Sequence, residues 1–260
     1  MIYNFDLSKK TILITGGYGY LGKAITESLL FHKATVIVLG RDENKFNDIF
    51  KSNNFLGTTL LFQHCDVSKT KSLKEAFLEI SKNNDISVLI NNAFYSSGQS
   101  PEQMADEDWE NGIDGTLNSV FRAIREIMPY FKNNSGGKII NVSSMYGVVA
   151  PEFSVYEDAP QFLNPPHYGA AKAGVIQLTK YYASYLGEYQ INVNTVTPGP
   201  FPSDSVQKDK DFIKALADKT CLKRIGEPDD LGGIFTFLSS DASNFITGQN
   251  FIVDGGWTSK

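Results

Sequence analysis

Residues 11–22 read TILITGGYGYLG, and this stretch decides how the whole chain is interpreted. Its first five residues are apolar or β-branched and favour a buried strand. Glycine then occupies positions 17, 19 and 22 in the spacing G-x-G-x-x-G, while Gly16, Gly19 and Gly22 stand three residues apart. Glycine allows a tight turn and a close approach of phosphate to the main chain, and a following helix presents free N–H groups. In this strand–turn–helix context the pattern predicts a dinucleotide site; the alternative is a purely structural turn.

The remainder of the chain alternates short apolar runs with helical patterns. The runs that favour buried strands are 11–15, 35–39, 59–63, 87–91, 138–142, 191–196 and 251–253. The helical patterns lie at 20–33, 43–52, 70–82, 106–132, 167–187 and, with a break, 205–239. Such alternation is typical of βαβ units with right-handed crossovers. We therefore expect an α/β protein with a doubly wound Rossmann-type fold and a parallel seven-stranded sheet, in a single domain over residues 1–260.

The composition excludes several classes of protein. A net charge of -5 and a pI near 5.3 argue against a general binder of nucleic acid or anionic membranes. Cys65 and Cys221 are the only cysteines, so no disulfide framework is expected, and neither has the neighbours of a metal site. The N-terminal residues MIYNFDLSKK lack the apolar core of a signal peptide, and no apolar run is long enough to span a membrane. We expect a cytoplasmic protein without a metal.

The end of the second predicted strand bears on the choice of nicotinamide cofactor. An acidic residue there binds the ribose 2′-hydroxyl of NAD, whereas an arginine accommodates the 2′-phosphate of NADP. In this chain Gly40 stands at the usual place of the acid, followed by Arg41 and Asp42. Arg41 favours NADP; Asp42 could still reach a ribose, and Arg41 could be only a solvated charge.

Tyr168 and Lys172 form a Y-x-x-x-K pair, whose side chains would share one face of a helix. A nearby ammonium favours the phenolate, so the pair could serve as a general acid/base for a hydroxyl–carbonyl interconversion. Lowering a tyrosine pKa from about 10 to neutrality requires roughly 4 kcal/mol. Because this spacing also arises by chance, the surrounding motifs must decide its meaning.

Several further motifs follow strands of the predicted sheet or lie on its helices. They are Cys65-Asp66-Val67, Asn91-Asn92-Ala93, NVSS ending at Ser144, YGAAK from Tyr168, Pro198-Gly199, RIGEP from Arg224 and TGQNFIVDGG from Thr247. Together with the glycine turn, they resemble the short-chain dehydrogenase/reductase family over nearly the whole chain. Ligands bind at the carboxyl ends of strands in such sheets.

The resemblance implies a role for each matching residue. Tyr168 would exchange a proton with the substrate oxygen, Lys172 would assist it, and Ser144 rather than the structural Ser143 would bind that oxygen. The cofactor contacts implied are Gly16, Tyr18, Gly19, Leu21, Arg41, Asp66, Val67, Asn92, Ala93, Tyr168, Lys172, Pro198, Gly199 and Ser203. The cofactor would be NADP, which Arg41 favours, or NAD.

Three departures from the family pattern stand out. Tyr20 replaces a glycine of the short members, so the turn has the spacing of a longer branch that modifies sugar nucleotides. Phe94 replaces the glycine that follows Asn-Asn-Ala. The family's helix-borne asparagine, which holds a water in a proton relay, aligns with Thr116; either Thr116 or Asn118 could hold that water, or the relay could be absent.

Residues 151–166, PEFSVYEDAPQFLNPP, form an insertion between Ser144 and Tyr168. We expect this loop to overhang the substrate pocket, where its aromatic and acidic side chains would suit a sugar; alternatively they pack the loop down or form a subunit contact. It resembles the loop of a subgroup that modifies bacterial surface sugars. His167 is expected to be a helix-start residue rather than a second base, and residues 204–210 a mobile polar lid.

The sequence therefore predicts an oxidoreductase that transfers a hydride between NADP(H) or NAD(H) and a secondary alcohol or ketone. The substrate would be a small molecule, a sugar or sugar derivative being one candidate and a ketoacyl thioester another. A non-catalytic cofactor-binding regulatory protein is the alternative from a different class, since fold does not fix function. The resemblance also implies a homo-oligomer, a tetramer or a dimer, that associates through residues 106–132 and 167–187.

Overall fold

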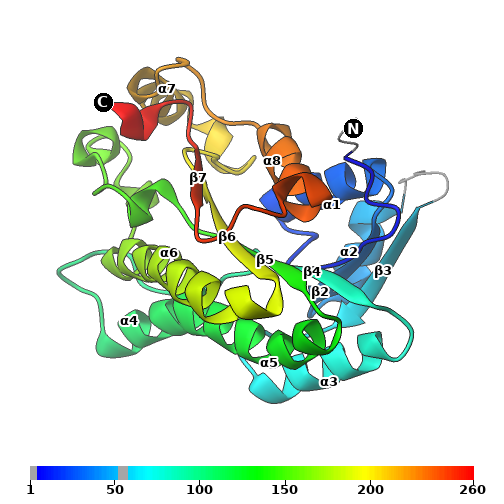
Figure 1. The fold of residues 1–260 in the computed structure, drawn as a ribbon. Helices are drawn as coiled ribbons and strands as arrows, with labels where there is room; N and C mark the ends of the chain where they lie inside the picture. Colours follow the sequence, from blue (N-terminus) through cyan, green and yellow to red (C-terminus); the bar gives the residue numbers. More distant parts are fainter. Residues whose placement is uncertain (1–4, 52–57) are drawn as a thin grey trace.

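The structure, a computed structural model, describes residues 5–51 and 58–260 and is built on one seven-stranded sheet. The strands are β1 Thr11–Thr15, β2 Thr35–Gly40, β3 Thr59–His64, β4 Ile86–Asn91, β5 Gly137–Val142, β6 Ile191–Pro198 and β7 Asn250–Val253. Their order in the sheet is β3-β2-β1-β4-β5-β6-β7, and every neighbouring pair is parallel. The predicted Rossmann-type fold is confirmed (Figure 1).

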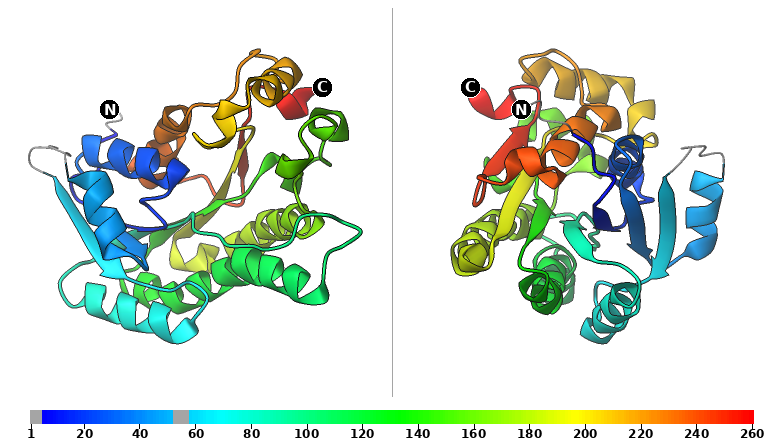
Figure 2. Two further views of the ribbon diagram at one scale, coloured as in Figure 1. Left: turned by 180° about the vertical axis from the view of Figure 1, so that it is seen from behind. Right: turned by 45° about the vertical axis from the view of Figure 1, so that its right-hand side comes forward.

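Helices cover both faces of this sheet, as Figures 1 and 2 show. The helices are α1 Tyr20–Phe31, α2 Glu43–Phe50, α3 Thr70–Ser81, α4 Asp106–Ile113, α5 Ser119–Asn133, α6 Pro166–Leu186, α7 Lys210–Lys219 and α8 Gly232–Ser239. Helices α3, α5 and α6 pack on one face, and α1, α2 and α8 pack on the other.

The strand sequences are apolar on both faces because each face is covered. Within β1, Leu13 joins the core under α3, α5 and α6, while Ile12 and Ile14 join the core under α1 and α8. All three side chains are fully buried. Successive strand residues point to opposite faces, so a continuous apolar run can supply both cores.

The structure refines the predicted helices at two places. The helix expected over residues 106–132 is interrupted by a π-helical turn at Asp114–Asn118, which separates α4 from α5. The region 205–239 contains the two helices α7 and α8, separated by an irregular segment. Residue 52, at the expected end of the second helix, and residues 1–4 of the N-terminal segment lie outside the described residues.

Residues 151–166 contain two short 3-10 turns, Phe153–Tyr156 and Pro160–Phe162. The rings of Tyr156 and Phe162 pack against Phe212 of α7, with centroid distances of 5.7 and 4.8 Å. The insertion is therefore fastened to α7 by aromatic contacts. Within the described part of the chain, no helix is both long enough and apolar enough to cross a membrane.

Candidate active site

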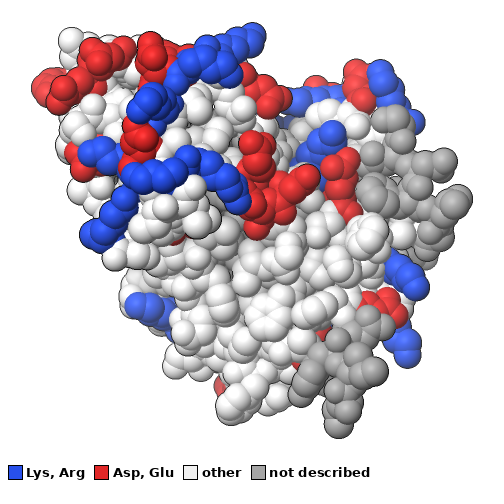
Figure 3. Space-filling view, turned by 90° about the horizontal axis from the view of Figure 1, so that it is seen from above, with Lys and Arg blue, Asp and Glu red and all other residues white. Residues whose placement is uncertain are grey.

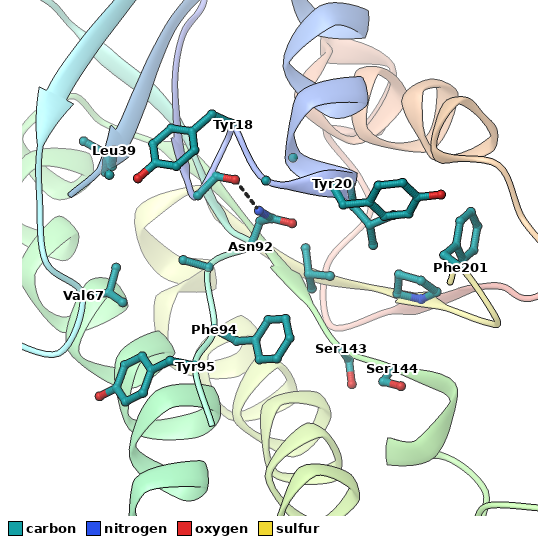
Figure 4. Close-up of a pocket in the computed structure, with 18 of the residues that line it drawn as sticks. Tyr18, Tyr20, Leu39, Val67, Asn92, Phe94, Tyr95, Ser143, Ser144 and Phe201 are labelled. Atoms are coloured by element: carbon teal, nitrogen blue, oxygen red, sulfur yellow. Dashed lines mark hydrogen bonds between the residues drawn. The ribbon is translucent and has the colours of Figure 1, made fainter. Parts of the chain in front are cut away.

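A cleft of about 520 Å³ lies where the turns that follow the strands meet at the carboxyl edge of the sheet. In Figure 4, Tyr18, Leu39 and Val67 lie at one end, and Ser144 and Phe201 lie at the other. The structure brings to this cleft every residue that the resemblance assigns to catalysis or cofactor contact, whereas the relay candidates Thr116 and Asn118 do not line it. Its lining includes Gly16, Tyr18, Gly19, Leu21, Arg41, Asp66, Val67, Asn92, Ala93, Ser144, Tyr168, Lys172, Pro198, Gly199 and Ser203.

The glycine turn is too tight for side chains at its centre. A Cβ atom on Gly22 would lie 2.2 Å from the carbonyl oxygen of Gly16, which is closer than any real contact. Helix α1 begins at Tyr20, directly after the turn, so its first N–H groups face the cleft end of β1. These features fit a pyrophosphate held at a helix N-terminus.

Asn92 ties the end of β4 to this turn. Its side-chain amide donates to the carbonyl oxygens of Thr15 and Gly16, at 3.0 and 3.1 Å. Figure 4 marks one of these bonds. The Thr15 hydroxyl oxygen in turn accepts the N–H groups of Asn92 and Ala93, both at 3.0 Å. Both amide hydrogens of the Asn92 side chain therefore bond to main-chain oxygens, and only the side-chain carbonyl oxygen is left for a ligand.

Arg41 and Asp42, which follow β2, differ in whether the described residues engage their side chains. The Asp42 carboxylate accepts the N–H of Lys45 at 2.9 Å and caps α2. Among the described residues, no hydrogen bond or ion pair engages the Arg41 guanidinium. Across the cleft, burial alone would raise the pKa of Asp66, but hydrogen bonds from Ser68 lower it overall.

Ser144, Tyr168 and Lys172 converge at the other end of the cleft. The Lys172 ammonium lies 5.5 Å from the centroid of the Tyr168 ring and donates to the carbonyl oxygen of Val142 at 2.8 Å. Ser144 lies two residues after the end of β5, and its hydroxyl oxygen accepts the N–H of Tyr146 at 3.2 Å. Its own hydrogen is directed at the Tyr168 hydroxyl, and a substrate oxygen placed beside both hydroxyls would compete for it.

The pKa values of this pair differ from the sequence-based expectation. Burial raises the pKa of Tyr168, a hydrogen bond with Ser144 opposes the rise, and Tyr156 adds to it. Burial also lowers the pKa of Lys172 to about 7. A lysine that is itself half neutral near pH 7 cannot exert the full electrostatic effect expected of it on the tyrosine, because desolvation disfavours both charged forms.

Three further polar residues belong to positions for which the sequence left alternatives open. The Ser143 hydroxyl donates to the Lys172 carbonyl oxygen at 2.8 Å, which is a structural role. The Asn118 amide donates to the Asp114 carboxylate at 3.1 Å. Thr116 lies in the π-helical turn, only 1% exposed, and its hydroxyl has no hydrogen-bond partner in the described protein.

Two of the departures from the family pattern occupy the cleft wall. Phe94, which is 54% exposed, packs edge-on against the Tyr168 ring at 5.8 Å. The Tyr20 hydroxyl accepts a hydrogen bond from the Gln207 amide at 3.0 Å. The segment expected to be a mobile lid is thus attached to the glycine turn.

The sequence analysis missed some lining residues altogether. These are Leu39, Tyr95, Val142 and Phe201. Leu39 and Val142 belong to strands, where an apolar residue carries no signal that it also faces a cleft. Tyr95 and Phe201 directly follow motif residues, so proximity to those motifs was the signal that could have found them.

The insertion does not line this cleft. None of residues 151–166 is among the lining side chains, so the expectation of an overhanging loop is not met there. Tyr156 is buried, and its hydroxyl shares a hydrogen bond with the hydroxyl of Tyr146. His167 is also buried and bonds through Nε2 to the carbonyl oxygen of Ser97, as expected of a structural residue rather than a base.

Within residues 5–51 and 58–260, no group of three or more histidine, cysteine or acidic side chains is placed to hold a metal ion. The polar groups that line the cleft are hydroxyls, an amine, a guanidinium, a carboxylate and amides. Their chemistry is that of hydrogen bonding and proton exchange.

Comparisons with known proteins agree over the whole chain. A family model described as enoyl-(acyl carrier protein) reductase matches residues 20–258. The 3-oxoacyl-[acyl-carrier-protein] reductase FabG of Chlamydia pneumoniae is 30% identical over 257 residues, or 98% of this chain and 99% of that protein. A short-chain dehydrogenase of Leptospira borgpetersenii with bound NAD+ is 33% identical, with a TM-score of 0.87 over 99% of this chain and 97% of that one. A gluconate 5-dehydrogenase of Burkholderia cenocepacia in complex with NADP and tartrate is 27% identical, with a TM-score of 0.88 over 99% and 98%.

Proposed function

Because the chain belongs to the short-chain dehydrogenase/reductase family and is an NAD(P)-dependent oxidoreductase, we propose that it interconverts a secondary alcohol and the corresponding ketone. The observation that carries the proposal is the convergence of Ser144, Tyr168 and Lys172 in the cleft that begins at the glycine turn.

The bound nicotinamide cofactor supplies or accepts the hydride. In this proposal the Ser144 hydroxyl donates to the substrate oxygen, and Tyr168 exchanges a proton with it. Lys172 already donates to the Val142 carbonyl oxygen, so its position beside Tyr168 is fixed before substrate arrives. Fixed donors cost no reorganisation during the reaction, which is the main advantage of such a site.

The favoured cofactor is NADP, with NAD as the alternative. Arg41 has no partner among the described residues, while the carboxylate of Asp42 caps α2. A free guanidinium suits a phosphate, whereas an acid engaged in a helix cap is less available to a ribose hydroxyl. The remaining contacts proposed are the glycine turn, Asp66 with Val67, Asn92 with Ala93, and Pro198 with Gly199 and Ser203.

The proposed substrate is a small, hydroxyl-rich molecule such as a sugar or sugar acid. The similarity to a gluconate 5-dehydrogenase solved with tartrate supports this choice. Similarity to 3-oxoacyl-[acyl-carrier-protein] reductases supports the alternative, a ketoacyl thioester.

The surface near α7 favours the free small molecule over a polyanionic carrier. Figure 3 shows acidic and basic side chains interleaved over part of this face. Lysines 214 and 219 pair with Asp218 and Glu152, and Arg224 pairs with Asp230. Paired charges of both signs give little net attraction for an extended acidic partner.

A homo-oligomer is also proposed. Phe121 on α5 and Tyr181 and Tyr185 on α6 are exposed by 39%, 61% and 51%. Aromatic side chains gathered on the helices that the family resemblance assigns to subunit contacts suit burial against a second copy of the chain. A tetramer is favoured, with a dimer as the alternative.

The test is turnover of purified protein with NADP or NAD on a panel of sugars, sugar acids and ketoacyl thioesters. Tyr168→Phe should remove nearly all turnover and leave cofactor affinity close to normal, because the phenol oxygen acts on the substrate. Wild-type protein that binds cofactor but turns over no substrate of the panel would favour the non-catalytic regulatory role. Full turnover by Tyr168→Phe would refute the assigned proton donor.

A further inference from the structure

Tyr18, from the glycine turn, reaches across to the end of β2. Its hydroxyl oxygen accepts the main-chain N–H groups of Arg41 and Asp42, at 3.1 and 3.3 Å. Its ring occupies the space beside Gly40, where an added Cβ would lie 2.3 Å from the ring carbon Cε1. The phenol oxygen therefore stands at the strand end where Rossmann-type folds meet the ribose 2′ position of a dinucleotide.

The hydrogen of this hydroxyl is still available. A tyrosine hydroxyl has one hydrogen to donate and two lone pairs to accept with, and both lone pairs are engaged by the two N–H groups. No acceptor for the hydrogen is found among the described residues, and Tyr18 lines the cleft. Two incoming N–H groups polarise the O–H bond, so this hydroxyl is a stronger donor than an isolated phenol.

Two cationic side chains belong to the same region, and one of them, Arg41, lines the cleft together with Tyr18. The Lys45 ammonium lies 5.9 Å from the centroid of the Tyr18 ring. The Arg41 guanidinium follows directly in the chain and has no partner among the described residues. The nearby carboxylate of Asp42 is held by the N–H of Lys45 in the helix cap. The local chemistry thus combines an available O–H donor with two cations, which suits a dianionic phosphate better than a neutral hydroxyl.

We infer that Tyr18 is a specificity-determining residue, whose hydroxyl, backed by the N–H groups of Arg41 and Asp42, donates to the 2′-phosphate of the cofactor. The inference rests on the proposed function, because it requires the adenosine half of the cofactor to lie at this end of the cleft. Tyr18 would then contribute a directed hydrogen bond to the NADP preference, which the charge of Arg41 alone does not provide.

The experiment measures binding of two nucleotides that differ only in the 2′-phosphate, adenosine 2′,5′-bisphosphate and adenosine 5′-monophosphate, by titration calorimetry. The full chain is used as wild type and as Tyr18→Phe, which keeps the ring against Gly40. A hydrogen bond to a charged group is stronger than one to a neutral group, so the bisphosphate should bind about tenfold more weakly to the variant. The monophosphate should weaken by less than about threefold.

Tyr20→Phe is the matched control, because Tyr20 lies in the same turn but its hydroxyl bonds to Gln207 instead. It should leave the ratio of the two affinities unchanged. The double variant Tyr18→Phe with Arg41→Gln provides a second measurement. Because both side chains would bind the same phosphate, its loss of bisphosphate affinity should differ from the sum of the losses in the two single variants. Melting temperatures of all variants identify any that fold poorly.

The outcomes separate the inference from the proposed function. Equal weakening of both nucleotides by Tyr18→Phe, or tighter binding of the bisphosphate, would overturn the role of Tyr18 while leaving the cofactor site intact. Failure of the wild-type protein to bind either nucleotide would overturn both.

Discussion

Tyr168 and Lys172 both favour their neutral forms where they lie. Burial raises the pKa of the tyrosine and lowers that of the lysine to about 7. Around neutral pH the pair can therefore exchange a proton with a substrate without first creating an isolated buried charge. Only the lysine pKa lies near the working pH that general acid–base catalysis favours, because the raised pKa of the tyrosine lies further from it.

The lowered pKa of Lys172 predicts a pH-dependent stability. Between about pH 7 and the unfolded lysine pKa, the unfolded chain binds more protons than the folded one, so the free energy of unfolding rises with pH. The variant Lys172→Met lacks this contribution. Between pH 7 and 9.5 the free energy of unfolding should therefore rise by on the order of 1–4 kcal/mol more in the wild type than in the variant. Urea unfolding at both pH values measures it. A difference between the proteins that stays constant with pH would contradict the prediction.

Thr116 gives a second prediction at the residue level. Its hydroxyl is buried without a partner among the described residues, and a relay water held at this position would need that hydroxyl. Thr116→Val keeps the shape and removes the hydroxyl, so turnover should fall by about tenfold or more. Cofactor affinity should stay the same, and the melting temperature should not fall, because an unpaired buried polar group is removed. Unchanged turnover would show that no relay passes through this position.

At the level of elements, the turns fix the site more strictly than the helices do. The glycine turn depends on the contact between Gly22 and the Gly16 carbonyl oxygen, where no side chain fits. Sequence spacing predicted this turn and the first strand, because glycine patterns and apolar runs have direct geometric meaning. The sequence pattern did not locate the π-helical turn at Asp114–Asn118, because one extra residue only shifts the phase of the apolar positions, and the short helices on either side each keep a helical pattern of their own.

Gly22→Ala should therefore sharply weaken cofactor binding and lower the melting temperature. Gly233→Ala is the matched control, because Gly233 lies in α8 and an added Cβ there meets nothing within 4 Å. The control should be neutral or stabilise by about 0.5–1 kcal/mol, since alanine favours helices over glycine. Cofactor titration and thermal unfolding measure both. Equal effects of the two substitutions would contradict the role given to the turn.

A hydrogen bond between the hydroxyls of Tyr146 and Tyr156 holds the insertion. It predicts that one substitution destabilises the protein and that a second substitution restores most of the stability. Both side chains are buried, so Tyr156→Phe leaves the Tyr146 hydroxyl without its partner. The single variant should lose about 1–3 kcal/mol of unfolding free energy, whereas Tyr146→Phe combined with Tyr156→Phe should recover most of it. A double-mutant cycle by urea unfolding measures the coupling. Additive losses would rule out the pair as the element that holds the insertion.

For the molecule as a whole, the parallel seven-stranded sheet and its two covered faces followed from the sequence, whereas the strand order and the use of the insertion did not. Apolar runs in alternation with helical patterns determine which strands are buried on both sides. Tyr156 and Phe162 read equally well as substrate contacts or as packing residues. Only the position of Phe212 on α7, far away in the chain, decides between them. Contacts between distant segments of this kind leave no local signal.

The proposed oligomer supplies the prediction at this scale. Tyr181 and Tyr185 stack on the exposed side of α6, with centroids 6.2 Å apart. Tyr181→Glu places a charge in this patch, which would be costly to bury against a second copy. Light scattering after gel filtration should show a smaller species than wild type. An unchanged mass would exclude this face as a subunit contact.

The hydrogen bond between Tyr20 and Gln207 opposes the separation of the glycine turn from residues 204–210. A neutral hydrogen bond that is exchanged for water contributes only about 0.5–1.5 kcal/mol. Thermal motion therefore breaks this hydrogen bond often. The bond hinders the entry and release of a nucleotide on that side only slightly. The time for which the cofactor stays bound would then depend on its contacts with the glycine turn and with Arg41, and not on the hydrogen bond that attaches residues 204–210.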